Sequence, residues 1–172
     1  TGMYSSTPTD PAKRIEEFKN LVNEIHKRGM GVSMDGVYNH TAKTSIFEDL
    51  EPNYYHLMDA DGTPRTSFGG GRLGTTHYMS RRVLVDSIKY LTEQYKVDGF
   101  RFDMMGDHDA ESIQKAFEEA RKLNPNLIML GEGWKTYAGD ENKAVQPADQ
   151  SWMKSTDTVA VFSDDIRNTL KS

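Results

Sequence analysis

The hydrophobic positions of the chain alternate between a helical period and short apolar runs. The first helical stripe follows Asp10-Pro11, where a capping carboxylate and a proline suit a helix start, and it ends near Gly29. Residues 31–38 then form a run that carries an acidic side chain towards its end. The pattern predicts a helix followed by a strand. The members of the helical stripe are Ile15, Phe18, Val22 and Ile25.

The same order of helix and strand recurs towards the C-terminus. The predicted elements are a helix from Ser80 with Val83, Ile88, Leu91 and Tyr95 on one face, a strand at 97–103, a helix at 110–122 with Ile113, Phe117 and Ala120 on one face, strands at 127–132 and 158–162, and the first turns of a helix at 164–170. Strands that alternate with helices favour a parallel sheet with right-handed crossovers. About four such units are visible, whereas a closed (β/α)8 barrel has eight and about 250 residues. The fold class is therefore α/β, either a small open sheet or half of a barrel.

Two stretches show no hydrophobic period. Residues 41–77 are rich in Asp, Gly, Pro and Thr, and a loop of this length inside a compact domain is usually functional or disordered. Within it, residues 59–62 are predicted to form a turn and residues 69–71, all glycine, to form a mobile hinge. Residues 141–157 are polar, contain Trp152 and are predicted to form a second long loop.

Composition narrows the classes of function. The 172 residues carry a net charge of −5, which argues against a nucleic-acid partner because phosphate contacts need a basic face. The chain has no cysteine, so disulfides and thiolate metal sites are excluded, and no apolar run approaches the roughly 18 residues of a membrane span. It starts at Thr1, with neither an initiator methionine nor a signal-peptide pattern. We therefore expect an internal segment of a longer protein, with no membrane contact of its own.

Three predicted strands end in carboxylates, Asp35, Asp103 and Glu132. The C-terminal ends of parallel strands converge on one rim, so these side chains are expected to meet in space. Gathering like charges raises the proton affinity of one of them, and glycosidic bond cleavage requires a protonated acid beside an ionised carboxylate. Arg101 lies two residues before Asp103, on the same face of the strand, where it is expected to keep that carboxylate ionised and correctly aimed.

Other residues carry weaker signals. His40 closes the run that begins at Asp35, and its place beside the same rim predicts a hydrogen bond with a substrate hydroxyl. The run Asp107-His108-Asp109 resembles a metal site, but one histidine between two acids fits capping of the following helix by Asp109 better. Aromatic candidates for stacking on sugar faces, or for ordinary packing, are Trp134, Tyr54 and Tyr55.

The residues alone leave three functional interpretations open. In the first, Asp103 and Glu132 hydrolyse a glycosidic bond. In the second, Asp35 and Asp103 hold Mg²⁺ for phosphoryl transfer in a small open-sheet protein. The third is non-catalytic, a carbohydrate-binding fragment or a folding unit of a barrel. The neighbour of Asp103 separates the two enzymatic interpretations, because the first predicts Arg101 there and the second a metal ion.

Three short motifs resemble the signatures of glycoside hydrolase family 13, the α-amylase superfamily. They are DGVYNH at residues 35–40, GFRFDMMG at residues 99–106 and GEGW at residues 131–134, and they follow the order of the family on successive predicted strands. The residues after Asp103 and Glu132, and FSDDIRN at residues 162–168, look most like type I pullulanases. Residues 51–76 are similar to the cell-surface pullulanases of streptococci.

The resemblance implies that residues 1–172 are the central segment of a catalytic (β/α)8 barrel, about its third to sixth units, with a long loop at 41–77. It implies that Asp103 is the nucleophile that forms a glycosyl-enzyme intermediate, and that Glu132 is the general acid and then the base. Arg101 would orient Asp103, and Asp35 would brace Arg101.

Three more roles follow from the resemblance. His40 would bind the sugar next to the scissile bond, and Trp134 would stack on sugar beyond it. Asn39 matches a calcium ligand of many α-amylases, so calcium binding is possible, although no cofactor is required for the reaction.

For the whole enzyme, the resemblance implies retaining endo-hydrolysis of α-1,6-glucosidic linkages in pullulan, glycogen and branched α-glucans. It also implies an extracellular or cell-surface location in a Gram-positive bacterium. The fourth signature of the family, which carries a third catalytic Asp, has no match in this sequence, so we expect the isolated chain to be inactive. Half a barrel leaves unpaired sheet edges, which predicts self-association.

Overall fold

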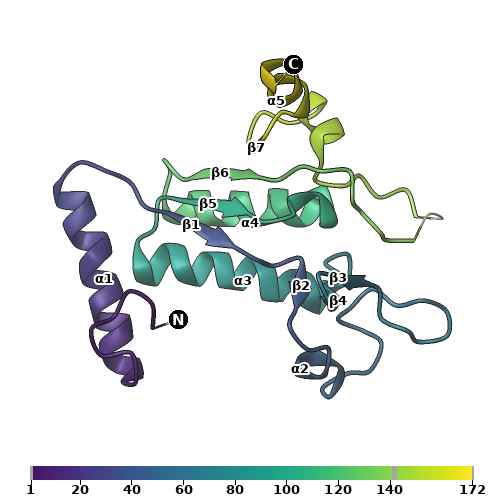
Figure 1. Cartoon of the computed structure of the whole chain (residues 1–172), viewed down its shortest axis with the longest axis horizontal. Helices are drawn as coiled ribbons and strands as arrows, with labels where there is room; N and C mark the ends of the chain where they lie inside the picture. Colours follow the sequence, from purple (N-terminus) through teal and green to yellow (C-terminus); the bar gives the residue numbers. More distant parts are fainter. Residues whose placement is uncertain (1, 141–142, 172) are drawn as a thin grey trace.

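The computed structural model describes residues 2–140 and 143–171 as a mixed α/β molecule built around one parallel sheet (Figure 1). The small helix α5 projects away from the rest, and α1 lies beyond the opposite side of the sheet (Figure 1). In chain order the elements are α1 (Pro11–Lys27), β1 (Ser33–Gly36), β2 (His40–Thr41), α2 (Ser45–Glu48), β3 (Thr66–Ser67), β4 (Gly70–Arg72), α3 (Tyr78–Tyr95), β5 (Gly99–Phe102), η1 (Met105–Asp107), α4 (Ala110–Leu123), β6 (Ile128–Gly131), η2 (Gln150–Lys154), β7 (Ala160–Val161) and α5 (Asp164–Lys171).

The parallel sheet has the strand order β1-β5-β6-β7, and every neighbouring pair is parallel. Gly36, Phe102 and Gly131 lie in one row across the first three strands. One residue further, the Asp103 amide donates to the Gly36 carbonyl and the Glu132 amide to the Phe102 carbonyl, both at 3.0 Å. The strands therefore end level at one rim. The α/β class and the partial barrel that the sequence predicts are confirmed.

Helices α3 and α4 pack against the sheet and supply much of the hydrophobic core. Burying one such side chain stabilises the fold by about 1.5–3 kcal/mol, so this cluster fixes the strands that carry the rim. Helix α3 begins at Tyr78 rather than at the predicted Ser80, whose buried hydroxyl donates to the Tyr55 carbonyl. Buried members of the core include Leu84, Val85, Ile88, Phe100, Phe102, Ile113, Ala116, Phe117, Ala120 and Met129.

The stretch 41–77 is not an irregular loop throughout, which corrects the sequence-based expectation. It holds the short helix α2 and a three-stranded antiparallel sheet in the order β2-β4-β3, which lies past the end of β1 (Figure 1). Gly70 and Gly71 are buried strand residues and not a hinge. A Cβ on Gly70 would lie 2.0 Å from the Thr41 carbonyl oxygen, so only glycine permits this pairing. The predicted turn at 59–62 is present, closed by a 2.9 Å hydrogen bond from the Gly62 amide to the Asp59 carbonyl.

The second polar stretch, 141–157, is also partly ordered. It contains η2, in which Trp152 is buried against the core, while residues 141 and 142 lie outside the described part. The parallel strands are shorter than predicted, since β1 covers 33–36 rather than 31–38. Within residues 2–140 and 143–171, no helix combines the length and apolar character needed to cross a membrane.

Candidate active site

One guanidinium joins three carboxylates at the rim of the parallel sheet. Nη1 of Arg101 lies 2.7 Å from Oδ1 of Asp35 and 3.0 Å from Oδ1 of Asp103. Nη2 of Arg101 lies 2.7 Å from Oε1 of Glu132. The three strand-end carboxylates therefore lie together around one cation, as the sequence predicts.

Strand register explains how these four side chains meet. Asp35 on β1 is the direct partner of Arg101 on β5, and Asp103 follows Arg101 by two residues on the same face. The side chains of Arg101, Asp103 and Glu132 are only 25%, 29% and 21% exposed, so they are shielded yet can be reached from solvent. The hydrogen bond to Asp35 raises the pKa of Arg101 above its ordinary value, with smaller contributions from Glu132 and Asp103, so this side chain stays charged.

A tight turn after β5 holds the end of β6. Met104 adopts the left-handed conformation at a φ of 45°, and its amide donates to Oε2 of Glu132 at 3.1 Å. The Gly106 amide donates to the Glu132 carbonyl at 3.0 Å, and a Cβ on Gly106 would lie 1.8 Å from the Trp134 carbonyl oxygen. The strain at Met104 and the close approach at Gly106 therefore both serve to position Glu132.

A buried carboxylate, Asp107, ties the β2-β4-β3 sheet to this rim. Its side chain is 1% exposed and pairs with Nη1 of Arg72 at 2.9 Å. It also accepts hydrogen bonds from Nδ2 of Asn39 at 3.0 Å, from Oγ of Ser67 at 3.2 Å and from the Thr136 hydroxyl. Three hydrogen-bond donors and one ion-pair partner thus converge on one carboxylate.

The side chain of Asn39 is buried and hydrogen-bonded at both its nitrogen and its oxygen. Its amide nitrogen donates to Asp107 and Ser67, and its Oδ1 lies 3.0 Å from Nδ1 of His40. No group of three or more His, Asp or Glu side chains that could hold a metal lies in the described ranges 2–140 and 143–171. The amide of Asn39 instead orients the imidazole of His40.

The aromatic candidates divide into two groups. Tyr55 stacks on Phe47 with centroids 4.9 Å apart, and Tyr54 meets Tyr55 edge-on at 5.1 Å, so the two tyrosines pack against neighbouring rings. Trp134 belongs to the rim, and the guanidinium of Arg167 on α5 lies 5.1 Å from the centre of its ring. A sugar that stacks on that face of Trp134 has to displace Arg167.

The run Asp107-His108-Asp109 makes structural contacts, including the predicted helix cap. Asp109 caps α4 by accepting the Ser112 amide at 2.9 Å, as predicted. His108 is fully buried, and burial lowers its pKa to about 4 despite the two neighbouring acids. Its Nε2 has no hydrogen-bond partner among the described residues.

Comparison with known proteins agrees with this geometry. No protein-family model matches the chain. Pullulanase A of Streptococcus pneumoniae serotype 2 is 79% identical over 172 residues, which are all of this chain and 14% of that protein. The catalytic module of "the Multi-modular glycogen-degrading pneumococcal virulence factor SpuA" superimposes with a TM-score of 0.96 at 78% identity, covering 100% of this chain and 24% of that one.

The chain corresponds from end to end to a segment of the pullulanases. The pullulanase SAP of group B Streptococcus in complex with maltotetraose also superimposes with a TM-score of 0.96, at 72% identity, over all of this chain and 22% of that one. The resemblance carried by the three motifs is thereby confirmed. The chain spans less than a quarter of each of these three relatives.

The contacts of Arg101 contradict the Mg²⁺ interpretation. Asp35 and Asp103 both contact the same nitrogen of Arg101, so the guanidinium fills the position that a bridging cation would need. Pairing of Arg101 with Asp103 is the arrangement that the glycosidase interpretation predicts.

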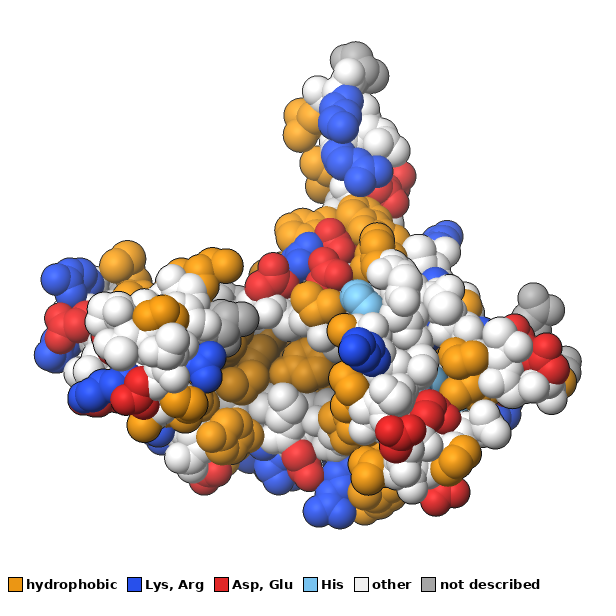
Figure 2. All heavy atoms as spheres, turned by 60° about the horizontal axis from the view of Figure 1, so that its bottom comes forward, with side chains coloured by type: hydrophobic (Ala, Val, Ile, Leu, Met, Phe, Trp, Pro, Cys, Tyr) orange, Lys and Arg blue, Asp and Glu red, His pale blue; other side chains and the backbone are white. Residues whose placement is uncertain are grey.

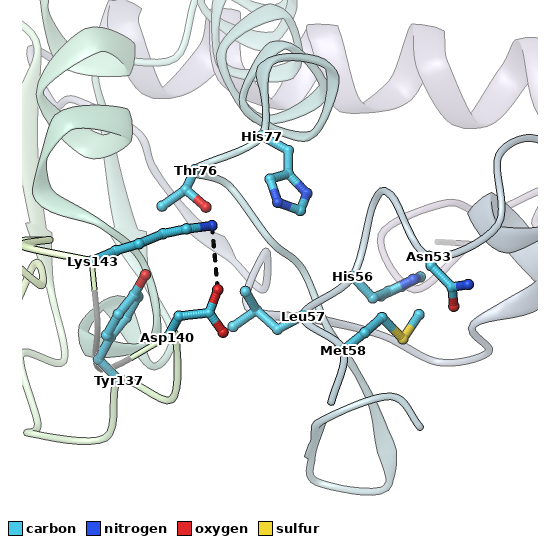
Figure 3. Close-up of a pocket in the computed structure, with 9 residues that line it drawn as sticks. All are labelled: Asn53, His56, Leu57, Met58, Thr76, His77, Tyr137, Asp140 and Lys143. Atoms are coloured by element: carbon cyan, nitrogen blue, oxygen red, sulfur yellow. Dashed lines mark ion pairs between the residues drawn. The ribbon is translucent and has the colours of Figure 1, made fainter. Parts of the chain in front are cut away.

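The chain also has a pocket of about 140 Å³ that is separate from the three carboxylates (Figure 3). It lies between the 41–77 stretch and the chain that follows Trp134. Lys143 and Asp140 form an ion pair of 3.2 Å across one side of it (Figure 3). The lining residues are Asn53, His56, Leu57, Met58, Thr76, His77, Tyr137, Asp140 and Lys143.

Sequence reasoning missed Asp107 and Arg72 as parts of the site. Asp107 directly follows the motif at residues 99–106, which was a usable signal, but its local sequence does not distinguish it from an ordinary loop carboxylate. Arg72 lies in the stretch without a period, and only the fold brings its side chain to Asp107.

Proposed function

We propose that this segment supplies the nucleophile and the acid/base of an enzyme that hydrolyses α-1,6-glucosidic linkages in pullulan, glycogen and branched α-glucans with retention of configuration. The observation that carries the proposal is the bridge formed by Arg101, which holds Asp103 and Glu132 on its two terminal nitrogens. Two carboxyl groups about 5–5.5 Å apart on either side of a sugar are the requirement for a retaining glycosidase.

In the first step, Asp103 attacks the anomeric carbon while Glu132 protonates the leaving oxygen. The bond to the aglycone breaks, a glycosyl ester forms on Asp103, and the proton from Glu132 leaves with the alcohol. Arg101 stays charged and aims the attacking oxygen through its 3.0 Å contact with Asp103.

In the second step, Glu132 takes a proton from water, which cleaves the ester and restores both carboxyl groups. Both oxygens of Glu132 have a partner in this structure: one forms an ion pair with Arg101, and the other accepts a hydrogen bond from the Met104 amide. Substrate therefore has to take over one of these positions, and the contact with Arg101 is the one a side-chain movement can release.

The names of the relatives support the substrate class and the location. The relatives are called pullulanase or glycogen-degrading, a structure of one of them contains maltotetraose, and several come from streptococci. For this chain we propose binding of an α-glucan, action at the surface or outside of a Gram-positive cell, and chemistry that needs no cofactor. The net charge of −5 supports the view that nucleic acid is not a partner.

Steady-state hydrolysis of pullulan by a catalytic module that contains this segment tests the proposal. Asp103→Asn removes the nucleophile and Glu132→Gln removes the transferable proton, so each is expected to lower kcat by about a thousandfold or more. Asp86→Asn is the matched control, because Asp86 lies on the exposed surface of α3 and pairs only at the surface with Arg82.

Reducing ends released from pullulan, together with the anomeric configuration of the fresh product by proton NMR, give the readout. Retention of the α-anomer with both variants inactive supports the proposal. An inactive parent module, inversion of configuration, or activity of Asp103→Asn near that of Asp86→Asn overturns it.

A further inference from the structure

The tip of the β3-β4 hairpin is a two-residue turn of unusual composition. Ser67 and Gly70 are direct partners, so Phe68 and Gly69 alone form the turn. Both have positive φ, 50° and 82°, which are the signs of a type I′ turn. Asn, Asp and Gly dominate these turns because other side chains crowd the backbone there. A phenylalanine in the first position is therefore strained.

The strain at Phe68 is not offset by burial. The residue is 74% exposed, among the highest values for large hydrophobic residues in the described chain. Other aromatic residues of the same stretch behave differently, since Phe47 and Tyr55 stack on each other at 4.9 Å. Both the conformation and the exposure of Phe68 cost stability, and such strain in folded proteins clusters at functional sites.

The ring of Phe68 lies beside His40. Their centroids are 5.9 Å apart at an interplanar angle of 42°. The hairpin is pressed against β2 closely enough that a Cβ on Gly70 would lie 2.7 Å from Cδ2 of His40. Ser67, next to Phe68, donates to the buried Asp107, which fixes the hairpin to the chain that follows β5. The aromatic ring is thus held on a rigid support.

We propose that Phe68 is a sugar-stacking residue of the pullulan-binding site, presenting its ring to the apolar face of a glucose unit that also reaches His40. The inference rests on the proposed function, and it adds a binding contact from the 41–77 stretch that lies outside the three motifs. A pyranose ring has one face lined by C–H groups, and an exposed aromatic ring beside a hydrogen-bonding imidazole matches that face and a hydroxyl at once. A strained turn gives the ring a fixed position at little entropic cost on binding.

Phe68→Asn is the most informative variant, because it is expected to relieve the strained turn and to weaken sugar binding at the same time. Asn suits the left-handed turn position, so the thermal unfolding temperature of the catalytic module is expected to stay the same or rise. Loss of the ring is expected to raise KM for pullulan about tenfold while kcat changes less than twofold. Phe68→Tyr keeps the ring and is expected to retain the parent KM. Tyr90→Ala, which removes another exposed aromatic ring near the C-terminal end of α3, is the matched control.

Titration of maltotetraose into the same variants in an Asp103→Asn background separates binding from catalysis. Weaker binding by Phe68→Asn, with Phe68→Tyr and Tyr90→Ala unchanged, supports the inference. If the parent hydrolyses pullulan and Phe68→Asn keeps the parent KM and affinity, the inference fails while the proposed function stands. A loss confined to kcat also overturns it. An inactive parent module is instead the failure of the proposed function, and the maltotetraose titration then still decides whether Phe68 contacts sugar.

Discussion

Replacing Asp107 by alanine removes the carboxylate that three hydrogen-bond donors and Arg72 contact. Arg72 loses a partner that is 1% exposed, and the hydrogen bonds from Asn39, Ser67 and Thr136 are lost with it. Breaking a buried ion pair by removing one member costs about 3–5 kcal/mol. Arg72 keeps two backbone acceptors, the carbonyls of Thr66 and Thr136, so the expected cost lies near the lower limit, about 3 kcal/mol.

This cost should appear locally, because Asp107 holds the β2-β4-β3 sheet to the end of β5. We expect the backbone amides of residues 66–72 to exchange with deuterium about a hundredfold faster in Asp107→Ala, since each 1.4 kcal/mol corresponds to a tenfold change. Amides in the middle of α3 and α4 should keep their protection. Hydrogen exchange measured by mass spectrometry on the catalytic module resolves the two regions.

Glu111→Gln is the control for this experiment. Glu111 also pairs with an arginine, Arg81, but its side chain is 78% exposed, and such surface pairs contribute about 0–1 kcal/mol. Equal exchange of residues 66–72 in Asp107→Ala and Glu111→Gln would refute the idea that the buried carboxylate anchors the small sheet. Uniform acceleration across α3 and α4 would also refute it, because the effect would then be global.

Three further predictions concern Arg101, His108 and the sheet edges. Arg101→Lys keeps the charge, but a single amine cannot contact Asp103 and Glu132 through separate nitrogens. We therefore expect kcat on pullulan to fall about a hundredfold while the circular dichroism spectrum stays unchanged, and a kcat near that of the parent would contradict this role. His108 has a folded-state pKa of about 4, below the ordinary value of 6.5, so the unfolded chain binds the extra proton and stability is lost as the pH falls from about 6.5 to 4. Urea unfolding should show a loss of about 3 kcal/mol over this range that His108→Gln largely removes, and equal slopes for the two proteins would argue against it. In the described part of the chain, β1 and β7 are the edges of the parallel sheet, and hydrophobic side chains gather in the hollow beside α1 (Figure 2). We therefore expect the isolated segment to self-associate, and a single monomeric species in sedimentation velocity would contradict this.

Helices α3 and α4 could be predicted because each buries an apolar face that recurs with the helical period. Asp10 and Asp109 mark the starts of α1 and α4 in the sequence, and both cap those helices in the structure. The rim could be predicted as well, since Asp35 lies near the end of one predicted strand, Asp103 and Glu132 end two others, and parallel strands end on the same side. Arg101 was also predicted to lie beside Asp103 and Asp35, and only its contact with Glu132 needed coordinates.

The small sheet could not be predicted, for a physical reason. Its strands have two or three residues, too few for an alternating pattern, and glycines 70 and 71 carry no side chain to mark a face. The contacts of Arg72 and the strained turn at Phe68 depend on this sheet, so they were equally hidden. A stretch of polar, glycine and aromatic residues has the composition of a loop, so its strands can be recognised only from the backbone pairing.

The central claim is that Asp103 is the nucleophile, held opposite Glu132 by Arg101. The most direct measurement is peptide mapping of a trapped intermediate in the catalytic module. Glu132→Gln slows the second step, and an α-glucosyl fluoride needs no acid to leave, so the glycosyl ester should accumulate. The account predicts one glucosyl adduct, on the peptide that contains Asp103. An adduct on a peptide carrying any other acid, or complete turnover with no ester detected, would contradict it.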